Sequence, residues 1–197
     1  MSSRIGRNTR SGWAELATAA GTQELTVTPA SLWHVPMIFD LMLEGSERGS
    51  FSDCYLDGRG YAKLLWKIGR GVMSSWLGSH DAWRVVEIGG EPAGFYVLTA
   101  PAALQCDTPL PDGCGIDAAK LSARILALCA IAPAHRGLGY GTSLMRLIQK
   151  AQTPDELLLV HCTKYARAMQ RVLRKVGFRR DPAGGTPVET YSWLAKA

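Results

Sequence analysis

The sequence predicts a single α/β domain in which a mixed, mostly antiparallel sheet of about seven strands is flanked by helices. Three observations support this fold class. Segments with the two-residue alternation of strands are interspersed with segments of helical spacing. Adjacent glycines, Gly89-Gly90 and Gly184-Gly185, indicate hairpin turns. The 197 residues are enough for one domain with a substantial core, which we expect at 24–197 after a flexible tail at 1–23.

The first half of the chain predicts a strand, two helices and a hairpin. Residues 24–30 alternate and are rich in β-formers, which is typical of a strand. A helix is expected within 31–51, where Ser31 can cap the first turn. A second helix is expected at 60–77, and residues 82–101 predict the first hairpin. The apolar positions that give the first helix its spacing are Trp33, Met37, Ile38, Leu41 and Met42.

The second half alternates strands with helices. Residues 121–133 form a long apolar run, as expected of a strand in the centre of a sheet. The other elements expected are a loop at 105–117, helices at 142–152 and 166–177, a buried strand at 156–162 and a terminal hairpin around Gly184-Gly185.

Composition excludes several classes of protein. No apolar run approaches the length of a membrane span, and the basic start lacks the apolar centre of a signal peptide. The formal charge of +5 is too modest to indicate nucleic acid by itself. The cysteines are odd in number and without CxxC spacing, which favours a reducing compartment, and by default the cytoplasm, over a disulfide or zinc framework. They are Cys54, Cys106, Cys114, Cys129 and Cys162. We expect no metal site.

The segment HRGLGYG, residues 135–141, lies between the apolar strand and the next helix. A helix start carries unpaired N–H groups and a partial positive charge, so it attracts phosphate. Glycines before it let successive N–H groups point at an anion, and a side chain there would block the phosphate. The alternative is a simple flexible turn. A Walker loop requires a lysine where this chain has Thr142, and the GxGxxG pattern of dinucleotide sites fails in both registers.

The residues of this loop and the order of elements around it resemble the GNAT superfamily of acyl-CoA-dependent N-acyltransferases. The family's loop pattern, Gln/Arg-x-x-Gly-x-Gly/Ala, is matched from Arg136 to Gly141, and the preceding strand and proline in CAIAPAHRGLGYG are also similar. A helix, a strand, a helix and the dipeptide Gly177-Phe178 follow in the family's order. As a pattern of elements, the resemblance extends over residues 24–194.

The resemblance implies that acetyl-CoA is a cosubstrate and that its site consists mainly of backbone. In the family, the central strand carries a bulge and separates from its neighbour, and the pantetheine arm pairs with the freed backbone groups as an added strand would. These groups would belong to Cys129, Ala130 and Ile131, and one N–H would polarise the thioester carbonyl. The residues implied for the pyrophosphate are Arg136, Gly137, Leu138, Gly139, Tyr140, Gly141 and Thr142.

The chain departs from the family where the catalytic acid is expected. Many members carry a tyrosine four residues before the glycine of the Gly-Phe pair and an asparagine seven residues earlier, and these positions are Leu173 and Ala166 here. The replacement candidates are Glu47, His161 and Cys162. For the glutamate a solvated helix end is the alternative, and for the other two it is packing or loop capping. Glu44 is an equal alternative to Glu47 as the base, and Tyr165 and Tyr191 could also reach the cleft.

The expected function is acyl transfer, acetyl above other groups, from acyl-CoA to a primary amine of a small molecule or protein. Two alternatives stay open: a non-catalytic acyl-CoA-binding module, and a toxin-like acyltransferase acting on aminoacyl-tRNA. The basic run at 171–180 could contact the 3′-phosphate of CoA or nucleic acid, although a solvated helix face is the simpler interpretation. We expect no membrane partner and leave a homodimer open.

Overall fold

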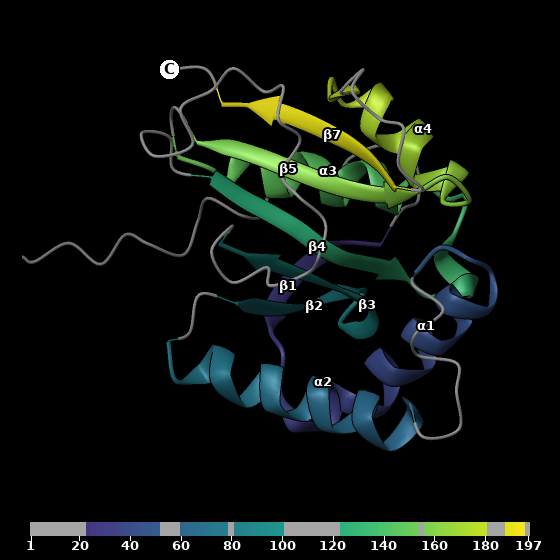
Figure 1. The fold of residues 1–197 in the computed structure, drawn as a ribbon, viewed down its shortest axis with the longest axis vertical. Helices are drawn as coiled ribbons and strands as arrows, with labels where there is room; N and C mark the ends of the chain where they lie inside the picture. Colours follow the sequence, from purple (N-terminus) through teal and green to yellow (C-terminus); the bar gives the residue numbers. More distant parts are fainter. Residues whose placement is uncertain are drawn as a thin grey trace, which may run out of the picture.

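The computed structural model describes residues 23–51, 60–78, 81–100, 123–153, 156–180 and 188–195 (Figure 1). Within these residues, seven strands form one sheet in the order β1-β2-β3-β4-β5-β7-β6, and only β4 and β5 are parallel. The strands are β1 (Leu25–Pro29), β2 (Ala82–Ile88), β3 (Glu91–Thr99), β4 (Ala123–Ile131), β5 (Leu157–Thr163), β6 (Arg179–Arg180) and β7 (Val188–Leu194). The predicted fold class is therefore confirmed.

Four α-helices of the described chain cover the two faces of this sheet (Figure 1). Alternation along the strands divides the core. Val85 and Phe95 pack with α1 and α2, whereas their neighbours Val86 and Tyr96 pack with α3 and α4. The helices are α1 (Val35–Glu47), α2 (Gly60–Trp76), α3 (Tyr140–Lys150) and α4 (Arg167–Lys175), and 3₁₀ turns η1 (Leu32–His34) and η4 (Pro133–His135) precede α1 and α3.

The first helix begins later than the apolar spacing predicts. Ser31 starts η1, where its N–H donates to His34 Nδ1 at 3.0 Å, and α1 begins only at Val35. Because a 3₁₀ turn has about three residues per turn, Trp33 does not lie on the face that carries Ile38 into the core. Its side chain is 91% exposed, so its assignment to the apolar face is wrong.

The other expected helices and strands are confirmed within a few residues. Helix α3 begins at Tyr140, two residues before its predicted start, so the last residues of the glycine loop belong to its first turn. Strands β6 and β7 pair antiparallel, as the terminal hairpin requires. Residues 1–22 of the tail predicted at 1–23, the loop at 105–117, the turn at Gly184-Gly185 and three of the cysteines lie outside the described residues.

Candidate active site

Strands β4 and β5 pair over only part of their length. Their parallel pairing runs from Ala123 and Leu157 to Leu126 and Val160. Beyond that point β4 stays paired with β3, and β5 with β7. On β3, Val97 pairs with Leu128 and Leu98 with Leu126, so Ala127 is the extra residue of a β-bulge. Because a bulge bends its strand, β4 turns away from β5 here, and a gap opens between them.

The backbone groups of β4 alternate between β3 and this gap. The Ala132 N–H donates to Ala93 O at 2.8 Å, and the Ala130 carbonyl faces β3, where it would overlap a Cβ on Gly94. Alternation then points the backbone groups of Cys129 and Ile131 at the gap. Of the three residues named for the pantetheine arm, the geometry therefore supports Cys129 and Ile131, while Ala130 faces β3.

The glycine loop carries the chain from β4 into α3. Gly137 and Gly139 have φ of +80° and +92°, and an added Cβ at either would meet no atom within 4 Å. Glycine is favoured here by the left-handed backbone rather than by lack of space. The Gly139 carbonyl accepts from the N–H groups of Thr142 and Ser143, so Gly139 caps α3. The N–H groups of Tyr140 and Gly141 belong to the unpaired start of the helix, which favours an anion.

One cleft of about 610 Å³ connects the loop to the gap. Its lining includes Gly139, Cys129 and His161, together with Phe51, after α1, and Tyr165, after β5. Thr163 Oγ1 donates to Gly49 O at 2.7 Å, which joins the end of β5 to the segment after α1. A cleft lined both by a helix start and by a free strand edge suits a long cosubstrate with an anionic end and a reactive end.

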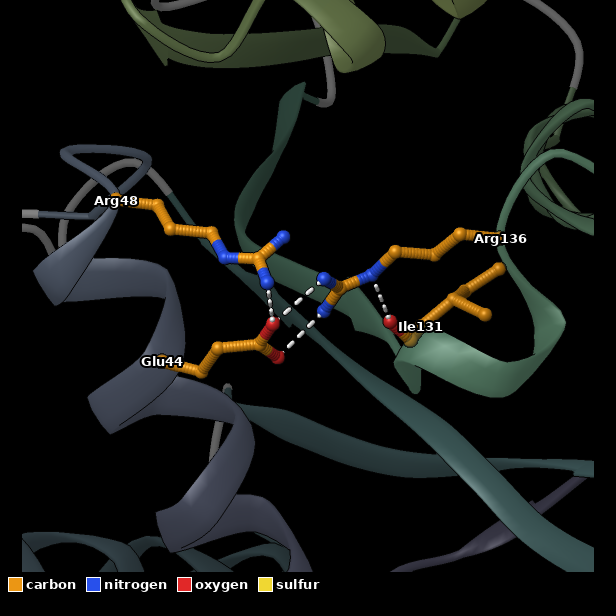
Figure 2. Close-up of polar contacts among 4 residues, drawn as sticks. All are labelled: Glu44, Arg48, Ile131 and Arg136. Atoms are coloured by element: carbon orange, nitrogen blue, oxygen red, sulfur yellow. Dashed lines mark hydrogen bonds and ion pairs between the residues drawn. The ribbon is translucent and has the colours of Figure 1, made fainter.

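Arg136 does not extend freely toward the glycine loop (Figure 2). Its Nη1 and Nη2 each lie 2.7 Å from a carboxylate oxygen of Glu44 on α1, and its Nε donates to Ile131 O at 2.8 Å. Arg48 contacts the same carboxylate at 2.9 Å. The hydrogen bonds from Arg136, together with the positive charges of both arginines, hold the pKa of Glu44 below its usual value against a smaller opposing effect of burial. Arg136 therefore joins the end of β4 to α1.

His161 lies on the wall of the cleft at the end of β5. Its Nδ1 is 3.2 Å from Thr190 Oγ1, and burial lowers its pKa from the ordinary value. The imidazole is therefore neutral near pH 7 and able to accept a proton.

Cys162 and Cys129 also line the cleft. Burial raises the pKa of each thiol to about 12, so both stay protonated. A protonated thiol is a poor nucleophile.

The remaining acid–base candidates lie in less favourable places. Glu47 is the exposed last residue of α1 and is not part of the cleft lining. Tyr191 is buried and donates to Glu189 Oε2 at 2.9 Å. Tyr165 reaches the cleft and is 60% exposed. Leu173, at the position of the family's acid, is fully buried in the core.

Sequence reasoning missed one feature of the cleft and left a second one open, since it raised the basic run at 171–180 only as a possible contact for the 3′-phosphate of CoA. The first is the pairing of Arg136 with Glu44, which joins residues far apart in the chain. The second is a row of basic side chains on α4, Arg167, Arg171 and Lys175, all of which line the cleft. The four-residue spacing of this row is visible in the sequence, but its orientation toward the loop is not.

In the described ranges no cluster of histidine, cysteine or carboxylate side chains could hold a metal ion. Within the same ranges, no helix is both long and apolar enough to cross a bilayer.

Two parallel strands that separate next to a glycine-capped helix start are typical of proteins that bind an extended anionic cosubstrate beside the sheet. The model of the GNAT acetyltransferase family matches residues 48–178, so the chain belongs to this family. The resemblance noted from the sequence is confirmed. No curated protein sequence matches the chain.

Solved structures share the fold at low sequence identity. Ribosomal L7/L12 alpha-N-protein acetyltransferase in complex with coenzyme A superposes with a TM-score of 0.59 at 14% identity, covering 90% of this chain and 97% of that one. The PaiA N-acetyltransferase of Thermoplasma acidophilum, also with coenzyme A, gives 0.61 at 12% identity, covering 88% and 99%. An aminoglycoside acetyltransferase with coenzyme A gives 0.58 at 16% identity, covering 87% and 95%.

Proposed function

We propose that this protein is an N-acetyltransferase that moves an acetyl group from acetyl-CoA to a primary amine. One observation carries the proposal: the free edge of β4 at Cys129 and Ile131 and the start of α3 at Gly139 lie in one continuous cleft. Family membership and the coenzyme A bound in several structural relatives support acetyl-CoA as the cosubstrate.

Each end of the cleft has a distinct part in binding. The N–H groups at the start of α3 hold the pyrophosphate, since they are unpaired and carry the positive end of the helix dipole. The backbone of Cys129 and the N–H of Ile131 pair with the pantetheine arm as a strand would. A backbone N–H of this strand end polarises the thioester carbonyl as negative charge develops on its oxygen.

His161 carries the proton in this proposal. The neutral amine attacks the carbonyl carbon, a C–N bond forms, and the C–S bond to CoA breaks. His161 accepts the proton that the amine loses and passes it to the departing thiolate, so no outside acid or base is consumed. A protonated Cys162 is a poor alternative acid, because its pKa is about 12, whereas an ordinary thiol has a pKa of about 8.5.

The acceptor amine is left open between a small molecule and a protein. Structural relatives act on both kinds, on a ribosomal protein in one case and on aminoglycosides in another. We place the reaction in the cytoplasm, because the scattered cysteines favour a reducing compartment.

Calorimetric titration with acetyl-CoA and CoA tests the binding half of the proposal, and thiol release on a panel of amines tests the catalytic half. A Gly139→Trp variant should lose binding, because a side chain at φ +92° is strained and would lie over the helix start. Binding with no turnover on any amine would favour a non-catalytic acyl-CoA-binding module, which the buried Leu173 also suggests. Salt-sensitive RNA binding would favour the aminoacyl-tRNA alternative. A folded protein that binds neither ligand would refute the proposal.

A further inference from the structure

We propose that the basic row on α4, formed by Arg167, Arg171 and Lys175, binds the phosphate groups of CoA in the place expected of Arg136. The inference rests on the proposed use of acetyl-CoA and assigns part of its binding to side chains that the family's loop pattern does not include.

The row lies on the cleft side of α4. Its members are four residues apart, so successive side chains are rotated by only about 40° and share one face of the helix. All three line the cleft together with the glycine loop. The opposite face of α4 is fixed in the core by Leu173, which is fully buried. The row therefore cannot turn away from the cleft without removing that side chain from the core.

Helix α4 lies directly beside the start of α3. A Cβ on Gly141 would be 3.7 Å from Val172 Cγ2, an ordinary packing distance. Val172 is the immediate neighbour of Arg171 in the helix. A phosphate held by the N–H groups of α3 would thus meet the guanidinium of Arg171 from the adjacent helix. Lys175 follows one turn further along.

Charge balance separates the row from Arg136. Arg136 donates through Nε, Nη1 and Nη2 to Ile131 O and the Glu44 carboxylate, so each of its three nitrogens already has a partner and its charge is shared with that carboxylate. In the part of the chain that the structure describes, no carboxylate pairs with Arg167, Arg171 or Lys175. The row is exposed and has three uncompensated positive charges on a cleft whose ligand carries a pyrophosphate and a 3′-phosphate.

Calorimetric titrations of CoA and dephospho-CoA, which lacks the 3′-phosphate, test the row. The variants are the double variant Arg171→Gln with Lys175→Gln, and Arg136→Gln. Arg174→Gln is the matched control: Arg174 is on the same helix and exposed, but it is not part of the cleft lining, and its Nε donates to Gln170 O. We expect the double variant to weaken CoA binding by about tenfold or more, the control to leave it unchanged, and the loss to shrink as salt is raised.

The two ligands locate the contact. A loss that is larger for CoA than for dephospho-CoA places the row on the 3′-phosphate, and an equal loss places it on the pyrophosphate; either result supports the proposal. Unchanged CoA affinity in a folded double variant overturns it while the proposed function stands. A loss confined to Arg136→Gln overturns it in favour of Arg136. A wild-type protein that binds neither ligand refutes the proposed function itself, and the inference with it. Melting curves, and Lys175→Gln alone, show that any loss is not a folding defect.

Discussion

The ion pair between Glu44 and Arg136 should stabilise the protein by a measurable amount, and Glu44→Gln tests this. The pair is bidentate, with both distances 2.7 Å, and its side chains are 22% and 36% exposed. Exposed pairs contribute about 0.2–1 kcal/mol, and solvent screening at Arg136 argues against a larger value. The bidentate geometry places this pair near the upper end, at about 1 kcal/mol. For a domain of this size, a loss of that magnitude lowers Tm by about 2–4 °C.

Glu47→Gln is the matched control, because Glu47 is an exposed glutamate on the same helix and, among the described residues, forms no ion pair with Arg136. Its Tm should stay within experimental error of the wild type. The pH dependence gives an independent test. Since the folded pKa of Glu44 is depressed, its contribution is fully present above the unfolded pKa of about 4.3 and is lost as pH falls through the lower folded pKa.

The Tm difference between wild type and Glu44→Gln should therefore be constant from pH 7 to about pH 5 and shrink below about pH 4. Differential scanning calorimetry over this range measures it. A difference that is absent at pH 7, or that persists unchanged at low pH, would refute the reasoning.

Kinetic measurements on Arg136→Gln separate a positioning role of Arg136 from phosphate binding. If Arg136 holds the end of β4, this variant should lower kcat/KM equally for acetyl-CoA and for a short acetyl thioester without phosphates.

Three further predictions follow from the cleft. His161→Ala should lower kcat about 10²- to 10⁴-fold in the thiol-release assay. The wild-type rate should fall only below the ordinary histidine pKa, because burial lowers that of His161; a Cys162→Ala variant that loses as much activity would contradict this assignment. Gly137→Ala should cost about 1–2 kcal/mol of stability, measured by denaturant unfolding, because its φ of +80° disfavours any side chain although the space is open; no change would mean that the loop relaxes. Leu173→Tyr should not raise kcat above the wild-type value and should destabilise the fold by about 1–3 kcal/mol, since the position is fully buried; a gain in kcat would show that the ring reaches the cleft.

The parts of the site that the sequence predicts are those in which one local requirement selects the residue. Gly137 and Gly139 have positive φ, which glycine adopts more readily than other residues, so glycines before a helix predict this conformation directly. The apolar run of β4 likewise indicates a strand in the centre of the sheet without information from elsewhere in the chain. The bulge at Ala127 is different: it is defined only by the register with β3, which a sequence pattern does not encode.

The choice between Glu44 and Glu47 shows the same limit. They are three residues apart on one helix, and either could face the cleft. Which one meets Arg136 depends on the rotation of α1 about its axis, and burial of Ile38 and Met42 against the sheet fixes that rotation. The prediction that Trp33 lies on the apolar face is wrong for a related reason, because nothing in the apolar spacing indicates that a 3₁₀ turn precedes α1.

The loss of the family's tyrosine and asparagine at Leu173 and Ala166 does not argue strongly against catalysis. Most of the proposed site is backbone: the start of α3, the free edge of β4 and the N–H proposed to polarise the carbonyl depend little on side chains. A thiol with an ordinary pKa of about 8.5 yields a thiolate that is a good leaving group, so its departure does not require an acid. The proton still has to leave the attacking amine, and a neutral imidazole in the cleft can accept it. In the proposed mechanism, a buried leucine in place of the acid therefore changes the route of the proton and leaves the means of binding and polarising the thioester intact.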